Sequence, residues 1–335
     1  MSKIEDFYEG KTVLVTGGVG SIGSEIVKNL LNLAPKVVRI LDINESKLFE
    51  FEEELNSRKV RTLIGDVRDK ERLRKAIEDV DIVFHAAALK HVPLCEYNPF
   101  EGVKTNVNGT QNLIDVALEE EVEKFITIST DKVVNPINVM GATKLLAERL
   151  TTSANLHKGE RRTALSVVRF GNVLNSRGSI LPTIKKQIQK GGPVKLTHPD
   201  MTRFVMSIDE ASKLVIKAAE RADGGDVFIL KMPALNIIDL IEVTIQELGP
   251  KYGYSPDEIE IEEIGIRAGE KLYEELMTSE EIDHAEEIED MFVFYNHGSL
   301  KKEDTGDVHL STRSDKASLL NKEEIRSMLK EIDYF

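Results

Sequence analysis

An acidic and a basic side chain are adjacent in the segment STDKVVNPINVMGATK, which runs from Ser129 to Lys144. Asp131 and Lys132 follow Thr130, so a hydroxyl, a carboxylate and an ammonium group occupy consecutive positions. Neighbouring groups of this kind can divide the duties of general acid and general base when burial sets their protonation states apart. The alternative is an ordinary exposed ion pair at the end of a strand. This triplet is the first candidate for proton transfer.

Met140 and Lys144 lie four residues apart in the same segment, which places them on one face of a helix. A methionine thioether neither donates nor accepts a proton usefully at neutral pH. If this face takes part in catalysis, Lys144 must act without an ionisable neighbour at that position, and other residues must move the protons.

A glycine-rich turn near the amino terminus has the pattern of a phosphate-binding loop. In TVLVTGGVGSIGSEIVKNLL, Gly17, Gly20 and Gly23 separate a predicted strand from a predicted helix, with Ser21 and Ile22 between the last two glycines. Small residues let the backbone approach a pyrophosphate, and the amides at the helix amino terminus stabilise its charge. A glycine-rich turn without a ligand is the alternative, but the strand and helix on either side favour dinucleotide binding.

Asp42 ends the second predicted strand, 19 positions after Gly23. A carboxylate there would accept hydrogen bonds from the adenosine ribose and repel a phosphate on that ribose. Since no arginine follows at once in DINESK, the pattern favours NAD over NADP. Alternatively, Asp42 caps a helix that starts near Glu45.

Other residues at strand ends complete the predicted cofactor site. Asp66 in GDVRD would meet the adenine together with Val67, or else cap a helix. Ala86 and Ala87 in HAAA give a floor of small residues on the nicotinamide side, and Asn106 lies in KTNVNGTQN nearby.

Short β-branched runs alternate with helical patterns through the first half of the chain, which predicts parallel strands joined by helical crossovers. The predicted strands are TVLVTG, KVVRILD, VRTLIGD, DIVFHAA, KFITIST and LSVVRFGN. The fold class is therefore α/β, with a doubly wound parallel sheet, and residues 1–174 form the dinucleotide-binding domain. Residues 175–298 are predicted to form a smaller substrate-binding lobe, partly interleaved with the first domain. Residues 299–335 form a polar tail with a closing helix, NKEEIRSMLKEI.

Composition narrows the possible partners. The chain has 335 residues and a net charge of -14, which argues against a nucleic-acid surface because that would need a basic face. Cys95 is the only cysteine, so no intrachain disulfide or cysteine-rich zinc site is expected. The histidines have no metal-ligand spacing, and no metal is predicted. The sequence has neither an apolar signal core nor a run long enough for a bilayer, so we expect a cytoplasmic protein without membrane insertion.

The motifs together resemble the extended short-chain dehydrogenase/reductase superfamily. More narrowly, they resemble the UDP-N-acetylglucosamine 4,6-dehydratases and capsular polysaccharide biosynthesis proteins, from about Lys11 to Asn296. The blocks that carry this resemblance are TGGVGSIG, Asp42, HAAALKHVPLCEYNP, KTNVNGTQN, STDKVVNPINVMGATK, VRFGNVLNSRGS, MTRFVMSIDEA and RAGEKLYEEL.

The resemblance implies a Rossmann fold and a lyase reaction, used in polysaccharide or glycan biosynthesis. The 4-hydroxyl of the sugar is oxidised by hydride transfer, the proton on carbon 5 leaves with the hydroxyl of carbon 6, and hydride returns to carbon 6. By resemblance, Asp131 protonates the departing hydroxyl and Lys132 takes the proton from carbon 5. The matching Lys144 binds the nicotinamide ribose.

Met140 departs from the form of this superfamily in which a tyrosine precedes Lys144 by four residues. A branch of the dehydratases also has methionine here, so the substitution does not imply an inactive protein. The proton of the 4-hydroxyl would then go to Asp131, to a water, or to a Thr130 hydroxyl linked to Lys144.

The same resemblance suggests the residues that bind UDP and the sugar. Guanidinium groups suit phosphate oxygens. The predicted substrate residues are Arg177, Arg203 and Arg267 for the diphosphate, Asn172, Asn175, Ser176 and Glu270 for the sugar and uridine, and Lys90 and His91 for the sugar pocket.

Two other functions stay open. An NAD-dependent 4-epimerase would oxidise carbon 4 without elimination, although the Asp131–Lys132 pair favours elimination. A catalytically silent dinucleotide-binding regulator is the third possibility. A homo-oligomer is expected, because relatives commonly pair through helices that correspond to Gly102–Leu118 and Met140–Leu156.

Overall fold

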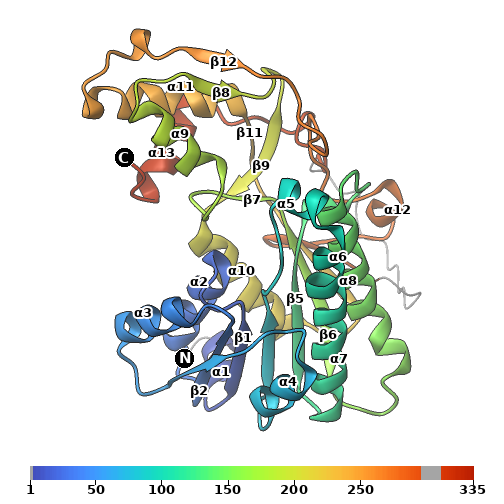
Figure 1. Cartoon of the computed structure of the whole chain (residues 1–335). Helices are drawn as coiled ribbons and strands as arrows, with labels where there is room; N and C mark the ends of the chain where they lie inside the picture. Colours follow the sequence, from blue (N-terminus) through green and yellow to red (C-terminus); the bar gives the residue numbers. More distant parts are fainter. Residues whose placement is uncertain (1–2, 296–310) are drawn as a thin grey trace.

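The computed structural model describes residues 3–295 and 311–335. In these residues the largest sheet has nine strands in the order β3-β2-β1-β4-β5-β6-β10-β14-β13 (Figure 1). All pairs from β3 to β10 are parallel, and at one edge β14 pairs antiparallel with both β10 and β13. This topology confirms the predicted doubly wound sheet. Its strands are β1 (Thr12–Thr16), β2 (Val37–Asp42), β3 (Val60–Ile64), β4 (Ile82–His85), β5 (Lys124–Thr130), β6 (Ala164–Phe170), β10 (Asp226–Leu230), β13 (Glu286–Ile288) and β14 (Met291–Tyr295).

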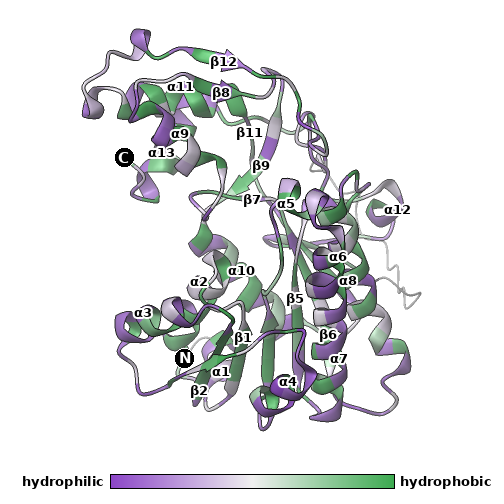
Figure 2. Cartoon of the chain, viewed as in Figure 1, coloured by the Kyte–Doolittle hydropathy of each residue, from purple (hydrophilic) through white to green (hydrophobic). Residues whose placement is uncertain are grey.

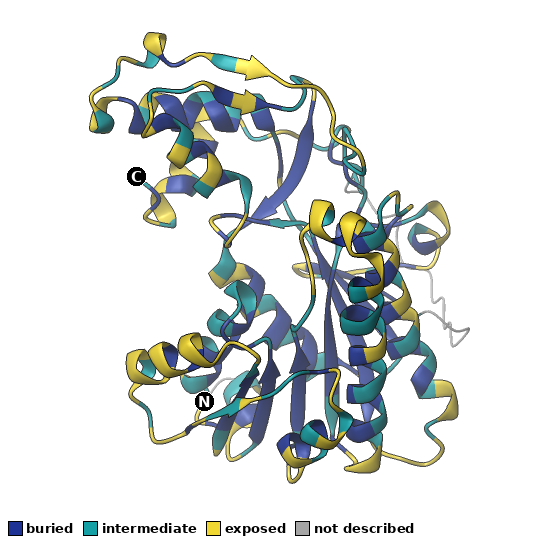
Figure 3. Ribbon diagram, viewed as in Figure 1, coloured by how far each residue is buried: buried dark blue, intermediate teal, exposed yellow. Residues whose placement is uncertain are grey.

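Helices cover both faces of this sheet because its strands are apolar on both sides. Val13 and Val15 pack with α2, α3 and α10 on one face, whereas Leu14 packs with α4 and α7 on the other. Figure 2 shows the apolar strands between helices with polar outer faces, and Figure 3 shows the same strands as buried. The helices of this domain are α1 (Lys3–Tyr8), α2 (Ser21–Leu31), α3 (Glu45–Leu55), α4 (Lys70–Ile77), α5 (Val92–Tyr97), α6 (Pro99–Gly102), α7 (Gly109–Glu119), α8 (Val139–His157), α10 (Ile208–Arg221) and α12 (Ser279–Ile282).

A smaller lobe has its own apolar core, built around Leu181, Ile241 and Leu329. The closing helix predicted from NKEEIRSMLKEI is α13, which packs on this core, while residues 299–310 of the predicted tail lie outside the described part. The elements of the lobe are β7 (Asn172–Val173), α9 (Ile180–Ile188), β8 (Val194–Leu196), β9 (Thr202–Met206), β11 (Ala234–Asn236), α11 (Ile237–Leu248), β12 (Ile261–Glu263) and α13 (Lys322–Glu331).

The chain crosses between the two parts several times. The strand β10 falls within residues 175–298, the predicted second lobe, but it extends the main sheet next to β6. Residues 175–298 therefore also supply β13 and β14 to that sheet. In the other direction, β7 leaves the main domain and pairs with β9. The described helices contain none that is long and apolar enough to cross a membrane.

The order of the strands predicts a ligand-binding crevice at the carboxyl end of β1. The strand β1 lies between β2 and β4, so the connections leave it toward opposite sides at this point. Ligands of doubly wound sheets bind at such a switch point, outside the carboxyl ends of the strands. The glycine turn follows β1 and the Thr130 triplet follows β5, and both therefore open onto the same edge of the sheet.

We expect Gly23→Ala to destabilise the protein by about 1–3 kcal/mol, because the new methyl group cannot be accommodated. A Cβ atom at Gly23 would lie 2.3 Å from the carbonyl oxygen of Gly17, which belongs to the backbone and cannot rotate away. Urea unfolding measures the change. Gly102→Ala is the matched control, since its Cβ would only touch Thr143 and Val139 at 3.7 Å. Equal stabilities of the two variants would contradict the prediction.

Candidate active site

The glycine turn brings the start of α2 close to the end of β4. Gly17 has a φ of +64°, and a Cβ there would lie 2.7 Å from the Cα of Ala87. The N-cap residue of α2 is Gly20, so no side chain caps the first amides of this helix within the described residues. The first amides of α2 are thus available to an anion, and the absence of side chains leaves room for it. This arrangement fits the pyrophosphate of a dinucleotide, as the sequence predicts for Gly17, Gly20, Ser21, Ile22 and Gly23.

Asp42 does not cap the following helix. Asn44 caps α3, since its side chain accepts a hydrogen bond from the amide of Lys47. The Asp42 carboxylate instead accepts from the amides of Asn44 at 3.0 Å and Val19 at 3.3 Å. Val19 belongs to the glycine turn, so Asp42 sits at the edge of the cradle where a ribose would lie.

Asp66 is not a helix cap either, because Asp69 caps α4. The Asp66 carboxylate pairs with Arg68 at 2.6 Å, and this hydrogen-bonded guanidinium lowers the pKa of the carboxyl. Val67 is buried next to Gly109. The side chain of Asp66 therefore already has a cation, and this was not apparent from GDVRD.

His85 is a buried residue of the site that sequence reasoning missed. Its Nδ1 lies 2.9 Å from the Thr16 hydroxyl, and its Nε2 lies 2.9 Å from the Thr110 hydroxyl. Thr110 donates its own proton to the carbonyl of Asn106, so we assign the imidazole proton to Nε2. Burial, together with the charge of Lys144, lowers the pKa of His85 to about 3. A neutral imidazole thus supports the floor formed by Ala86 and Ala87.

Asn106 holds the loop after β4. It lies on a π-helical turn, Val103–Asn108, between α6 and α7. Its amide exchanges hydrogen bonds with the backbone of Leu89 at 2.8 and 3.0 Å and donates to Thr143 at 3.0 Å. The side chain predicted to touch the cofactor is therefore committed to positioning the loop that precedes Lys90.

The predicted acid and base form a close pair at the end of β5. The ammonium of Lys132 lies 2.8 Å from Oδ1 of Asp131, and the Thr130 hydroxyl donates to the same oxygen at 3.0 Å. Asp131 is fully buried, and its Oδ2 has no hydrogen-bond partner among the described residues. The alternative of an ordinary exposed ion pair is excluded because the carboxylate of Asp131 is fully buried. One carboxylate oxygen of Asp131 is thus left to accept a hydrogen bond from outside the described residues.

Glu274 is a third member of this cluster and was not predicted. Its Oε1 lies 3.6 Å from Nζ of Lys132 and 3.9 Å from Nε of Arg203. Burial raises the pKa of Glu274, and although Lys132 opposes this, the negative charge of Asp131 adds to it. Burial alone would lower the pKa of Lys132, but the carboxylates of Asp131 and Glu274 together raise it. The motif RAGEKLYEEL contained Glu274, but its spacing gave no sign of the contact with Lys132.

Lys144 lies behind this cluster on α8. Its ammonium donates to the carbonyl of Ile128 at 2.6 Å, and burial lowers its pKa to about 8, although the charge of Glu148 opposes the change. Met140 is buried one turn earlier on α8. The first turn of α8 packs tightly on the triplet because Gly141 has no side chain: a Cβ there would lie 2.3 Å from the carbonyl oxygen of Lys132.

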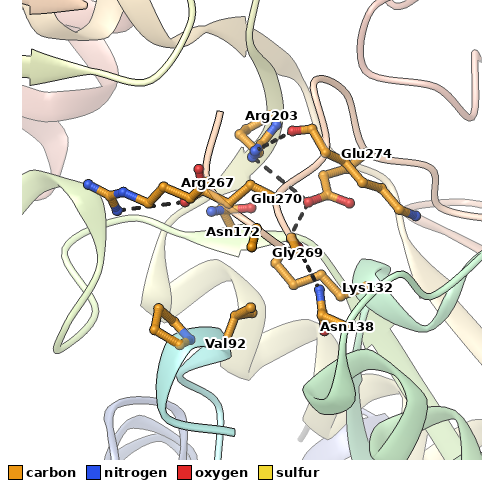
Figure 4. A pocket seen from close by; sticks show the side chains of 12 residues that line it. Val92, Lys132, Asn138, Asn172, Arg203, Arg267, Gly269, Glu270 and Glu274 are labelled. Carbon is orange, nitrogen blue, oxygen red and sulfur yellow. Dashed lines mark hydrogen bonds and ion pairs between the residues drawn. The ribbon is translucent and has the colours of Figure 1, made fainter. Parts of the chain in front are cut away.

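A cavity of about 160 Å³ opens next to Lys132 (Figure 4). It brings together several residues from the two lobes that the sequence had singled out separately. The lining includes Lys132, Asn172, Arg203, Arg267, Glu270 and Glu274. The loop that carries Arg267 and Glu270 is fixed to α8 because Asn138 donates to the carbonyl of Gly269 at 2.9 Å.

Arg203 was predicted to bind the diphosphate, but most of its guanidinium is engaged by the protein. Its guanidinium is buried and donates to the carbonyls of Thr202, Leu272 and Lys271 at 2.7, 3.2 and 2.8 Å. These hydrogen bonds hold the loop that carries Glu274 and leave less of the guanidinium for a ligand. By contrast, Arg267 has an exposed side chain whose nearest carboxylate is Glu270 at 3.7 Å.

Other predicted substrate residues lie apart from the cavity. Arg177 contacts the glycine turn: its amide donates to the Ser21 hydroxyl at 3.0 Å and its guanidinium to the carbonyl of Val19. Ser176, which precedes it, is buried. Asn175 lines a separate cleft between α10 and α13.

Lys90 and His91 are exposed beside the loop that carries Arg177. The ring of His91 packs on Gly178, where a Cβ would lie 2.3 Å away from it. Although Lys90 is exposed as a whole residue, partial desolvation of its ammonium and the charge of Arg177 lower its pKa. Among residues 3–295 and 311–335, no group of acidic, histidine or cysteine side chains could hold a metal ion.

Comparison with known proteins identifies a family. A family model described as polysaccharide biosynthesis protein matches residues 13–296. An uncharacterised membrane protein of Methanocaldococcus jannaschii is 69% identical over 99% of this chain and 98% of its own length. A UDP-N-acetylglucosamine 4,6-dehydratase (inverting) of Campylobacter jejuni is 44% identical over 85% of this chain and 83% of its own. A UDP-glucose 4-epimerase of Rickettsia rickettsii is 37% identical over 98% of this chain and 97% of its own.

Solved structures agree with the fold. The X-ray structure of Pen from Bacillus thuringiensis has a TM-score of 0.91 and 44% identity, and it covers 97% of this chain and 98% of its own. A dTDP-glucose 4,6-dehydratase from Streptomyces venezuelae, solved with NAD bound, has a TM-score of 0.69 at 21% identity over 78% of this chain and 86% of its own. At that identity the likeness concerns the fold alone.

We expect Lys144→Met to raise the free energy of unfolding of the ligand-free protein at pH 7, by about 1–3 kcal/mol. The folded protein lowers the pKa of Lys144 from 10.5 to about 8, so the unfolded chain binds the proton more tightly and the buried charge is destabilising below pH 8. This penalty disappears as the pH rises from 8 to 10.5, and the gain from the substitution should shrink over the same range.

Urea unfolding at pH 7 and pH 10 measures this difference. Lys47→Met, on the exposed face of α3, is the matched control and should change stability little at either pH. A Lys144→Met variant that is less stable than the parent at pH 7 would show that the buried ammonium carries no penalty.

Proposed function

Because the chain belongs to the polysaccharide biosynthesis protein family, we propose that it is a UDP-N-acetylglucosamine 4,6-dehydratase that forms a UDP-4-keto-6-deoxy amino sugar. The observation that carries the proposal is the buried Asp131–Lys132 pair, at 2.8 Å, beside a cavity lined by residues of both lobes. Elimination of water needs an acid and a base on the same small region of a sugar, and this pair supplies both.

A nicotinamide cofactor bound at the glycine turn would accept hydride from carbon 4 and return it to carbon 6. The dehydratase structure with NAD bound supports such a cofactor, and the open amides at the start of α2 fit its pyrophosphate. Gly17, Gly20 and Gly23 would let it approach, while Arg177 would close the turn from the side of the smaller lobe.

In this proposal Asp131 moves one proton from the 4-hydroxyl to the departing hydroxyl. Thr130 donates to Oδ1 of Asp131, so a proton that Thr130 takes from the sugar has a carboxylate to receive it. Protonated Asp131 then gives that proton to the hydroxyl of carbon 6, which leaves as water. The carboxylate is restored, and neither step needs a phenol at Met140.

Lys132 takes the proton from carbon 5 and later returns it there. For this task the amine must first be neutral, and the same amine then holds the abstracted proton until the hydride has returned to carbon 6. Lys144, whose ammonium donates to the carbonyl of Ile128 on β5, would bind the nicotinamide ribose.

The position of the Asp42 carboxylate supports NAD, rather than NADP, as the cofactor. Its carboxylate lies at the edge of the cradle, bonded to the amide of Val19, where a phosphate on the adenosine ribose would be repelled. The cytoplasmic location stays a prediction. The predicted homo-oligomer is supported by exposed apolar side chains on α5, α6 and α8, namely Tyr97, Phe100, Leu146 and Leu156.

A 4-epimerase is the second candidate, and the relative of Rickettsia rickettsii favours it. An epimerase oxidises carbon 4 but expels no hydroxyl from carbon 6. The buried Asp131–Lys132 pair would then have no leaving group to protonate, so the geometry supports the dehydratase better. A silent regulator is disfavoured further, because it would bury unsatisfied charges without using them.

The purified protein, incubated with UDP-N-acetylglucosamine and NAD, should form a 4-keto-6-deoxy product that NMR identifies. Asp131→Asn and Lys132→Ala should each lower kcat by about 10²–10⁴-fold, because each removes one proton-transfer group. Asp209→Asn, on the exposed surface of α10, serves as the control. A galacto product would make the protein an epimerase, and NAD binding without turnover would make it a regulator.

Equilibrium binding should show a preference for NAD over NADP of about tenfold or more, and Asp42→Asn should narrow it. Glu45→Gln removes a charge at the start of α3, three residues after Asp42, and should leave the preference unchanged. Tighter binding of NADP by the unmodified protein would overturn the role of Asp42.

A further inference from the structure

The proposed reaction leaves one proton unexplained. Lys132 must be a neutral amine before it can take a proton from carbon 5, yet two neighbouring carboxylates favour its ammonium form. Asp131, the nearer of them, is occupied with the proton of the 4-hydroxyl. The other carboxylate, Glu274, is the remaining group near Nζ that could receive this proton and keep it until the amine is needed again as an ammonium group.

We propose that Glu274 is the residue that takes the proton from Lys132 and so makes it a base. Its Oε1 lies 3.6 Å from Nζ, a separation that a small rotation of the lysine side chain would close to a hydrogen bond. Its other oxygen, Oε2, is buried without a hydrogen-bond partner among the described residues. Both residues line the same cavity (Figure 4).

The surroundings of Glu274 suit a proton acceptor. The charged groups that face it are Lys132 and Asp131 from the end of β5, Arg203 from β9, and Lys271 from its own loop. Burial and the charge of Asp131 favour the protonated carboxyl, and the three cations favour the carboxylate. Burial is the largest of these effects and raises the pKa of Glu274, which makes its carboxylate a better proton acceptor than an exposed glutamate.

The backbone fixes Glu274 in this place. Its amide donates to the hydroxyl of Ser314 at 2.9 Å, and the amide of Ser314 donates back to its carbonyl at 2.9 Å. Ser314 is fully buried and its hydroxyl also lies 2.8 Å from that of Thr202. The position of the carboxylate is thus held from the carboxyl-terminal segment as well as from β9.

The proton balance closes within this cluster. Lys132 gives a proton to Glu274, and the resulting amine takes the proton from carbon 5. After hydride has returned to carbon 6, the ammonium gives that proton to carbon 5, and Glu274 returns its own to the amine. Asp131 separately moves the proton of the 4-hydroxyl into the departing water. Glu274 acts through Lys132 and is a positioning residue rather than a group that touches the sugar.

This inference rests on the proposed dehydratase, so its test includes a measurement that needs no turnover. Competitive acylation, followed by mass spectrometry of the peptide that contains Lys132, gives the apparent pKa of that amine. We expect Glu274→Gln to lower this pKa, because it removes one of the two carboxylates that stabilise the ammonium. Glu275→Gln is the matched control: its side chain contacts Asn135, and the variant should not change the value.

The kinetic test compares kcat across pH. Glu274→Gln should leave KM for UDP-N-acetylglucosamine unchanged, and its kcat should rise by about tenfold per pH unit as solvent deprotonates Lys132, whereas the kcat of the parent should change little over the same pH range. Glu274→Asp should keep the pH profile of the parent at a lower kcat, and it replaces Glu274→Gln if that variant does not fold.

The outcomes distinguish a failure of the role proposed for Glu274 from a failure of the proposed dehydratase activity. An unchanged pKa of Lys132 in Glu274→Gln, or a kcat that keeps the height and pH profile of the parent, would overturn the role of Glu274. If the parent protein forms no 4-keto-6-deoxy product but the pKa of Lys132 falls as expected, the coupling of the two residues stands and the dehydratase proposal is the one that fails.

Discussion

The structure depends on burying opposite charges together at the end of β5. Asp131 and Glu274 are carboxylates and Lys132 and Arg203 are cations, and ion pairs link them in the order Asp131, Lys132, Glu274, Arg203. Buried charges are strongly destabilising unless they are paired and hydrogen-bonded. Here each carboxylate nevertheless keeps one oxygen without a hydrogen-bond partner in the described residues. In the proposed reaction, these two unpartnered oxygens would let the cluster exchange protons.

The two lobes must meet for this cluster to exist. The main sheet supplies Asp131 and Lys132, whereas the smaller lobe and the loop after it supply Arg203 and Glu274. A hydrogen bond joins the two parts here, because Lys271 donates to the carbonyl of Val134 at 2.6 Å. The cavity is thus a property of the junction, and neither lobe would form it alone.

A second buried charge network steadies the helix that carries Lys144. Arg169 on β6 lies between Glu148 of α8 at 2.8 Å and Glu281 of α12 at 2.9 Å. Glu148 is one turn from Lys144 and partly offsets the effect of burial on its pKa. The lysine is therefore held near the point where it can be charged or neutral, although Met140 gives it no ionisable partner.

The sequence by itself determined the features that depend on neighbouring residues. The glycine turn, the six parallel strands of the first half and the adjacency of Asp131 and Lys132 follow from local pattern, because strand, turn and helix preferences act over a few residues. The tertiary structure decided which distant side chains join them. It placed Glu274 beside Lys132, enclosed His85 between two threonines, turned Arg203 toward backbone carbonyls, and moved β10 into the main sheet. These outcomes depend on how buried polar groups find partners across the fold, and that competition is settled only when the whole chain packs.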